Sequence, residues 1–262
     1  MGWKGMAIGA YLGSLFGGPL GAILGGVLGH KVEGAAFGRK RKVSYASMSP
    51  GNQSMVFCGS IAAMLAKMAK ADGVVTRAEI DGVERAFWRL GFSPAARRYA
   101  VGVFRRAKDD AHSIYDYARE FARAVDSVDV REFLYEILWD IACSDGALDQ
   151  AELLILQRIP RALGIRAEWY GYFASRRVGG RGGSDGGRDA ARDPLADAYA
   201  VLGAHAGDSA EELKRKYREL AKRNHPDALR AQGLPEEMVG KATARMSRIN
   251  AAWAEIKQAR GF

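Results

Sequence analysis

Apolar residues recur at helical intervals along most of this chain. The pattern runs through residues 55–172 and again through residues 194–262. Residues 5–29 differ, because they contain no charge and are bounded by Lys4 and by His30-Lys31. The pattern therefore predicts an all-α protein with an N-terminal transmembrane helix, a helical bundle and a C-terminal helical hairpin.

The uncharged segment is long enough to cross a bilayer. As a helix it reaches about 37 Å, more than the ~30 Å hydrocarbon core. Basic residues lie mainly after it, at Lys31 and in the run 39–42. Basic flanks stay in the cytoplasm. We therefore expect residues 1–42 to form a single-span anchor with a basic cytoplasmic flank, and the later domains to be cytoplasmic.

Glycine recurs at every fourth position of this segment. On a helix this spacing makes a bare stripe along which a second helix can approach closely. The pattern predicts a homodimer formed through the membrane helix, with its central contacts at Gly9, Gly13, Gly17, Gly21 and Gly25. The alternative is that glycine is merely frequent in membrane spans and that Pro19 marks a kink.

The middle of the chain contains an internal repeat at an offset of 73 residues. Asp72-Gly73 corresponds to Asp145-Gly146, and Glu79 corresponds to Glu152. Each unit reads as an apolar-faced helix, a turn at Asp-Gly and a second helix. The repeat predicts two helical hairpins that pack their apolar stripes against one another, with two further helices between them.

The carboxylates of the repeated turns suggest a metal site. Asp72, Glu79, Asp145 and Glu152 provide four hard oxygen ligands if the turns meet. Helix capping is the alternative, because the residues before Glu79 and Glu152 fit capping boxes. An EF-hand is excluded, since Val74 and Ala147 occupy ligand positions. No cofactor is required by the sequence.

Residues 52–175 resemble the TerB-like (tellurite-resistance) helical domain, through their paired Asp-Gly…Glu turns. The resemblance implies an all-α bundle and favours a divalent cation bound by the four carboxylates. Residues 176–193 follow as a linker rich in glycine and charge, for which we expect a flexible tether. Its GGRGG run also resembles arginine-glycine segments that contact RNA.

The C-terminal module, residues 194–262, contains the most specific pattern. A basic helix ends at Pro226, because proline lacks an N–H, and leaves His225-Pro226-Asp227 exposed between two antiparallel helices. Charged residues recur on one face of this helix at Lys214, Arg218 and Lys222. The apolar residues of the two long helices form a stripe that we expect to be buried between them.

This module resembles the J-domain, through the run YRELAKRNHPD from Tyr217 to Asp227. The resemblance implies that His225, Pro226 and Asp227 trigger ATP hydrolysis in a DnaK-type chaperone. It also implies that a docking face for that partner is formed by Lys214, Tyr217, Arg218 and Lys222. Two departures, Glu219 within the basic helix and Ala228 after the loop, suggest retuned docking.

The order of the parts resembles the DjlA-type membrane-anchored DnaJ-like co-chaperones, whose J-domain includes an insert like Arg230–Met238. That resemblance implies the inner membrane of a Gram-negative bacterium, with the N-terminus periplasmic, and a role in the stress response. It also implies recruitment of clients or partners by the TerB-like domain. We expect a co-chaperone that is not itself an enzyme, because His225 and Asp227 have no nucleophile or pocket beside them.

Charge and cysteine content add two constraints. The net charge of +9 predicts an anionic partner: an acidic protein surface, a lipid headgroup or a nucleic acid. The two cysteines, Cys58 and Cys143, lie in apolar runs and indicate buried thiols in a reducing compartment. Two other functions stay open, a basic nucleic-acid-binding protein and a metal sensor whose output is the J-domain. We expect no nucleic-acid partner, because the basic helix lacks interleaved aromatic residues.

Overall fold

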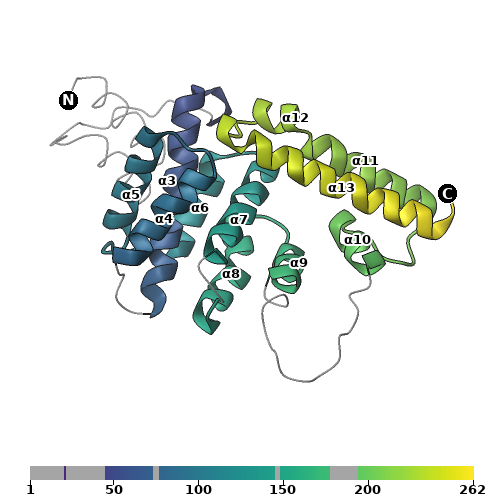
Figure 1. Cartoon of the computed structure of the whole chain (residues 1–262), viewed down its shortest axis with the longest axis horizontal. Helices are drawn as coiled ribbons and strands as arrows, with labels where there is room; N and C mark the ends of the chain where they lie inside the picture. The colour runs from purple at the N-terminus through teal and green to yellow at the C-terminus, as the bar shows by residue number, and fades with distance from the viewer. Residues whose placement is uncertain (1–20, 22–44, 73–76, 145–147, 178–193) are drawn as a thin grey trace.

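In the computed structural model all regular structure is helical over the residues that it describes, namely 21, 45–72, 77–144, 148–177 and 194–262. This confirms the all-α prediction for these ranges. A bundle of helices forms one end of an elongated molecule, and the two long C-terminal helices run from its side to the other end (Figure 1).

The predicted anchor lies outside the described residues, except for Gly21, which is helical and buried. The glycine stripe, the basic flank and most of the linker also lie outside them. Among the described helices, none combines the length and the apolar character that a membrane span needs. The transmembrane helix and the homodimer therefore stay predictions.

The bundle is organised around α3 (Pro50–Ala69), whose side chains from Val56 to Ala66 are all buried. A helix that is apolar on every side belongs at the centre of a bundle. It packs against α5, α6 and α7, and less extensively against α4. The remaining elements of the bundle are η1 (Tyr45–Ser47), η2 (Lys70–Asp72), α4 (Arg77–Arg89), α5 (Pro94–Ala107), α6 (Ile114–Ala124), α7 (Val128–Ala142), α8 (Gln150–Leu163) and α9 (Glu168–Arg177).

The helices of the predicted repeat are present. α3 and α4 form the first pair, and α7 and α8 form the second. The second pair has the predicted capping box, in which Asp149 accepts from the Glu152 N–H and Glu152 accepts from the Asp149 N–H. α8 ends at Gly164, whose φ of 61° is left-handed and favours glycine.

The C-terminal module consists of two long helices and three shorter elements. α11 and α13 lie side by side with α10 packed against both (Figure 1). Its core contains Leu213, Leu220, Ile249 and Ile256, four residues of the predicted stripe. The elements are α10 (Pro194–Leu202), α11 (Ala210–Asn224), α12 (Pro226–Ala231), η3 (Glu236–Met238) and α13 (Val239–Arg260).

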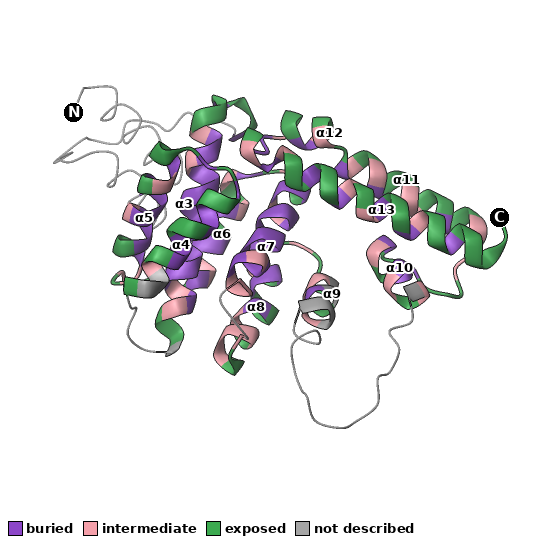
Figure 2. Ribbon diagram, in the orientation of Figure 1, coloured by how far each residue is buried: buried purple, intermediate pink, exposed green. Residues whose placement is uncertain are grey.

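One part of this module belongs to the core of the bundle. Leu229, Leu234, Met238 and Ala242 are buried in the same apolar cluster as α3 and α7, separate from the cluster between α10, α11 and α13. The buried core of the bundle therefore continues into α12 and the N-terminal part of α13. The ends of α11 and α13 that lie away from the bundle expose much of their surface (Figure 2). The sequence analysis predicted a flexible tether before this module, and the structure adds a packed interface with the bundle.

Candidate functional site

The turn between α11 and α12 is built by His225 and Pro226. α11 ends at Asn224, because Pro226 cannot donate a backbone hydrogen bond to it. His225 has extended backbone angles (φ −62°, ψ 131°) and caps the end of α11 and the start of α12. Its ring Nδ1 accepts from the Asp227 N–H at 3.3 Å. The turn predicted from the sequence is therefore the first turn of a short helix.

Both candidate side chains of this turn face solvent. The side chains of His225 and Asp227 are 57% and 75% exposed. Asp227 accepts a hydrogen bond from Arg230 Nη1 at 2.8 Å, and the same guanidinium donates to Glu236 at 2.9 Å. The hydrogen bond to Glu236 raises the pKa of Arg230, which keeps it cationic beside Asp227. The carboxylate is thus oriented by its own helix and stays accessible to a partner.

The exposed side of α11 leads directly to this turn. Lys214, Arg218 and Lys222 are exposed and make no ion pair with any residue in the described ranges. Glu219 does not neutralise them, because it pairs with Arg215 at 3.2 Å. The acidic departure in the basic helix is therefore balanced locally, and the face that leads to His225 remains positive.

Tyr217 differs from its neighbours on α11. Its ring is half-buried and stacks on Trp253 of α13, with centroids 4.9 Å apart and planes within 8°. Its hydroxyl donates to Asn250 at 3.2 Å. Tyr217 therefore joins the two long helices, and only one side of its ring remains available to a partner.

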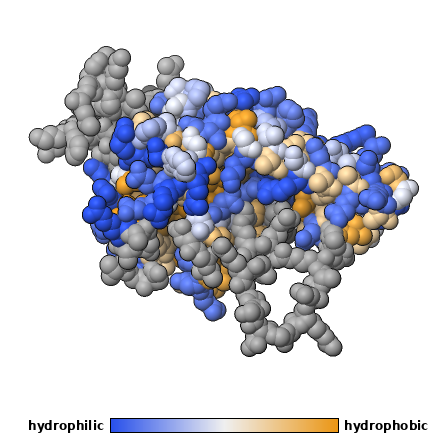
Figure 3. All heavy atoms as spheres, in the orientation of Figure 1, coloured by the Kyte–Doolittle hydropathy of each residue, from blue (hydrophilic) through white to orange (hydrophobic). Residues whose placement is uncertain are grey.

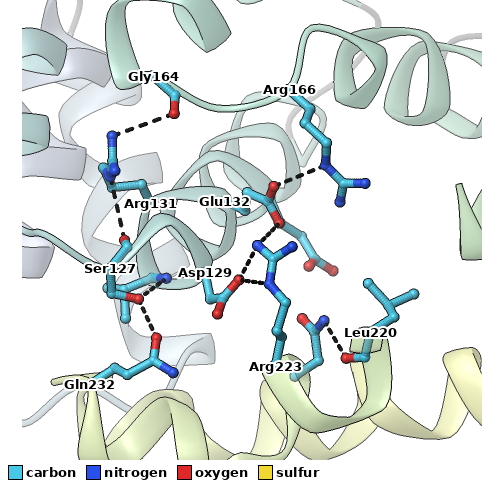
Figure 4. A network of polar contacts seen from close by, with 12 residues as sticks. Ser127, Asp129, Arg131, Glu132, Gly164, Arg166, Leu220, Arg223 and Gln232 are labelled. Carbon is cyan, nitrogen blue, oxygen red and sulfur yellow. Dashed lines mark hydrogen bonds and ion pairs between the residues drawn. The ribbon is translucent and has the colours of Figure 1, made fainter. Parts of the chain in front are cut away.

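The other side of α11 faces a row of carboxylates on α7. Asp129 and Glu132 are buried there, with 8% and 2% of their surface exposed. Arg223 Nε donates to Asp129 at 2.7 Å, and a second nitrogen of Arg223 lies 4.0 Å from Glu132. Arg166, which precedes α9, approaches Glu132 from the opposite side at 3.3 Å (Figure 4).

A buried arginine of α13 contacts the same row of carboxylates. Arg245 is 4% exposed and lies 3.7 Å from Glu132 and 3.6 Å from Glu136. Glu136 also pairs with Arg248, and Asp140 accepts from Lys241 at 2.8 Å. We call this set of ion pairs the ionic seam. It consists of Asp129, Glu132, Glu136 and Asp140 of α7, Arg223 of α11, and Lys241, Arg245 and Arg248 of α13. A buried ion pair costs much of what it gains, so we expect it to select one docked orientation more than to add stability.

The insert between α12 and α13 closes the interface at one end. Gly233 has φ +97° and lies so close to the Tyr45 ring that an added Cβ would meet it at 2.7 Å. Ser54 donates to Glu237 at 2.5 Å, and Ser127 donates to the side chain of Gln232. Figure 4 shows Gln232 beside Ser127 at the start of α7. The insert therefore attaches the module to the bundle together with the ion pairs of α11 and α13.

The sequence analysis did not identify this interface, although two signals of it exist. Arg245 has the same helical register as the buried residues Ala242, Ile249 and Ile256 of α13. A charged residue on an apolar stripe indicates a buried partner of opposite charge. The acidic residues of α7 also recur at helical spacing, at Asp129, Glu132, Glu136 and Asp140.

The predicted metal ligands fall mostly outside the described part. Asp145 and the side chains of Asp72 and Glu79 are not described, while Glu152 is engaged in its capping box. Within the described residues, no group of three or more His, Cys, Asp or Glu side chains is placed to hold a metal ion. The metal site stays a prediction.

A melting experiment tests that prediction. A cation held by Asp72, Glu79, Asp145 and Glu152 at one hundred times its dissociation constant stabilises the fold by about 2.7 kcal/mol. Calcium is therefore expected to raise the Tm of the detergent-solubilised chain by about 5–10 °C. The Asp72→Ala/Asp145→Ala variant is expected to lose this shift and to melt like the metal-free protein. An unchanged Tm of the wild-type chain in calcium, magnesium and manganese would leave capping as the role of the glutamates.

Comparisons with known proteins match both halves of the described structure. The family model described as tellurite resistance protein TerB matches residues 59–171, and the DnaJ domain model matches residues 197–260. No solved structure gives a significant match. Among curated relatives, the Co-chaperone protein DjlA of Escherichia coli (strain K12) is 31% identical over 235 residues, which cover 86% of each chain. The protein of the same name from Yersinia pseudotuberculosis serotype I is 33% identical, with 100% of each chain covered.

Proposed function

The chain belongs to the family of DjlA co-chaperones, and from this premise we propose that it stimulates ATP hydrolysis by a DnaK-type chaperone at the inner membrane. In this proposal the His225-Pro226-Asp227 turn triggers hydrolysis, and Lys214, Tyr217, Arg218 and Lys222 dock the partner. The TerB-like bundle recruits clients or partners and holds the J-domain.

The observation that carries the proposal is the division of α11 into two faces. Arg223 is bound to Asp129 in the ionic seam, whereas Lys214, Arg218 and Lys222 stay exposed beside His225. The J-domain is therefore attached to the bundle without covering the face that a chaperone would use. A positive face of this kind accelerates encounter with an acidic partner and makes the association sensitive to salt.

Single-turnover ATP hydrolysis by DnaK tests the proposal. The detergent-solubilised chain is expected to accelerate hydrolysis, and salt is expected to weaken the effect because the docking face is exposed. A parallel RNA-retention assay addresses the nucleic-acid alternative. RNA retention without any ATPase stimulation would overturn the co-chaperone proposal.

The nucleic-acid alternative has little support on α11. Binding of single strands uses aromatic rings as stacking platforms between basic residues. The aromatic residue of α11, Tyr217, already stacks on Trp253. The other alternative, a metal sensor whose output is the J-domain, depends on the cation predicted at the repeated turns and shares the melting test given above.

We place the membrane anchor in residues 1–42, with the N-terminus periplasmic and both domains cytoplasmic. The support is the uncharged segment 5–29 and the basic residues that follow it. The glycine stripe supports a homodimer through this helix. In lipid the hydrophobic effect does little to bring two helices together, so their association depends on close packing of small residues.

Replacing Gly13, Gly17 and Gly21 by leucine is expected to abolish self-association of the anchor but not its insertion. Leucine removes the close approach of two backbones and partitions favourably into hydrocarbon. A two-hybrid reporter for membrane-helix association, carrying residues 1–42, measures the loss. Leucine at Ala7, Ile8 and Ala10, which lie off the stripe, is the matched control. Equal association of the triple-glycine variant and the wild type would contradict the stripe model.

A further inference from the structure

Five exposed arginines lie on α4 and α5, two helices of the bundle that pack against each other. Arg85 and Arg89 of α4 are exposed, and so are Arg98, Arg105 and Arg106 of α5. None of the five makes an ion pair with a residue that the structure describes. We call these five arginines, together with Trp88, the arginine face.

The arginine face contains few compensating charges. The sequence of α5 includes no acidic residue, and the described carboxylates on α4 are Asp81 and Glu84. Strongly hydrophilic residues gather over this part of the molecule (Figure 3). The arginines repel one another, and an anionic partner relieves that repulsion.

Trp88 lies within the arginine face and is 65% exposed, although tryptophan is usually well buried. It does not join the neighbouring aromatic contact, in which Phe87 packs against Phe92 inside the bundle. An exposed indole combines an apolar ring with a polar N–H, and this amphipathic group favours the boundary between lipid headgroups and acyl chains. Exposed arginines on the same two helices as an exposed tryptophan are therefore typical of a surface that lies on a membrane.

We propose that the arginine face binds the anionic headgroups of the membrane in which the chain is anchored. This rests on the proposed anchor, because residues 30–44 join the predicted span to Tyr45 and extend at most about 50 Å. Within that distance the bundle can reach the cytoplasmic leaflet, which is negatively charged. Headgroup binding would hold the bundle against the cytoplasmic surface of the membrane, which the anchor keeps within reach.

The placement of the face is compatible with chaperone binding. α4 and α5 lie at the end of the molecule opposite to the free ends of α11 and α13 (Figure 1). The ionic seam attaches the J-domain to α7, which lies on another side of the bundle from α5 (Figure 1). Lipid contact through the arginine face therefore leaves the basic side of α11 and the His225-Pro226-Asp227 turn exposed to the cytoplasm.

Fluorescence of Trp88 in vesicles tests this surface. The full chain is reconstituted in brominated phosphatidylcholine, with or without phosphatidylglycerol, and the Trp88 signal is the difference between the wild type and Trp88→Phe. Bromine quenches indoles at the membrane boundary, so quenching is expected to rise about twofold or more with phosphatidylglycerol. About 0.5 M salt is expected to remove the increase.

A charge-matched pair of variants identifies the arginines responsible. Arg89→Glu/Arg98→Glu is expected to lose the phosphatidylglycerol-dependent quenching, while Arg158→Glu/Arg161→Glu on exposed positions of α8 keeps it. Both variants are expected to stimulate DnaK in detergent like the wild type, since neither touches α11 or the ionic seam. Loss of RNA retention by Arg89→Glu/Arg98→Glu with no change in quenching would assign the face to nucleic acid and overturn the proposal.

Flotation of the vesicles separates the two proposals. A chain that floats with both kinds of vesicle, but whose Trp88 is quenched equally in both, retains the anchor and overturns headgroup binding by the arginine face. A chain that floats with neither overturns the anchor and the lipid surface together. Unchanged DnaK stimulation in either case keeps the co-chaperone function.

Discussion

His225→Gln is expected to reduce stimulation of DnaK by this chain to the unstimulated rate while the fold stays intact. The side chain is 57% exposed, and its Nδ1 accepts a hydrogen bond from the Asp227 N–H. Loss of a side-chain cap costs about 1 kcal/mol, which a packed helical module tolerates. Single-turnover ATP hydrolysis by DnaK, with equal amounts of each protein, measures the effect.

Asn224 provides a contrasting position next to the turn. Its side chain is buried and donates to the Leu220 carbonyl at 2.8 Å inside the module, so it belongs to the fold and not to the exposed surface. Asn224→Ala is expected to lower the Tm, whereas His225→Gln is expected to lower only the ATPase stimulation. Full stimulation by His225→Gln would refute the assignment of the trigger turn.

Glu132→Ala is expected to release the J-domain from the bundle. It removes the carboxylate that faces Arg166, Arg223 and Arg245, and it leaves the buried Arg245 with Glu136 alone. Breaking a buried pair typically costs about 3–5 kcal/mol. Because Glu136 remains, we expect about 2–3 kcal/mol, or about a 30- to 150-fold increase in the undocked fraction.

Hydrogen exchange measures this release. The N–H groups of Leu234 and Met238 donate to the carbonyls of Leu229 and Pro235, next to core residues of the bundle. Both should exchange faster by about the same factor in Glu132→Ala. Asp140→Asn is the matched control, because the Lys241 that pairs with Asp140 is 44% exposed; its effect should stay below about fivefold.

Replacing both Glu132 and Arg245 distinguishes the loss of an ion pair from general destabilisation of the core. Glu132→Met/Arg245→Met removes the buried charges together, and apolar groups of similar size often replace such a pair without loss. The double variant is therefore expected to exchange much closer to the wild type than Glu132→Ala does. Slow exchange in Glu132→Ala itself would mean that the apolar residues of the insert are sufficient for docking.

The helices of this protein were predictable because their signals are local. Ser113, Asp149 and Ser209 cap their helices through residues three positions later, and Pro226 ends α11 regardless of what surrounds it. The spacing of apolar residues also predicted the buried residues of α11 and α13, because residues three or four positions apart lie on the same side of a helix. The exposed turn and the basic face of α11 followed from these elements.

The docked position of the J-domain was not predictable in this way. The contacts of Arg223 with Asp129 and of Arg245 with Glu132 join residues about a hundred positions apart, and each charge alone reads as part of a solvated helix face. The glycine-rich linker gives no information about the contact, since a flexible chain permits many arrangements. In the sequence, Leu234 and Met238 belong to the insert and show no sign of a partner in the bundle. Only the packing of the two domains shows that both are part of the core of the bundle.

The sequence by itself therefore determined the helices, their ends, the resemblance to known domains and the position of the His225-Pro226-Asp227 turn, because neighbouring residues encode these features. The tertiary structure decided which side of α11 is covered and which is free. That choice depends on complementary charges and buried apolar groups from α3, α7 and α13, which meet only when the chain is folded. Here it places Arg223 in the interface and leaves Lys214, Arg218, Lys222 and His225 exposed to a partner.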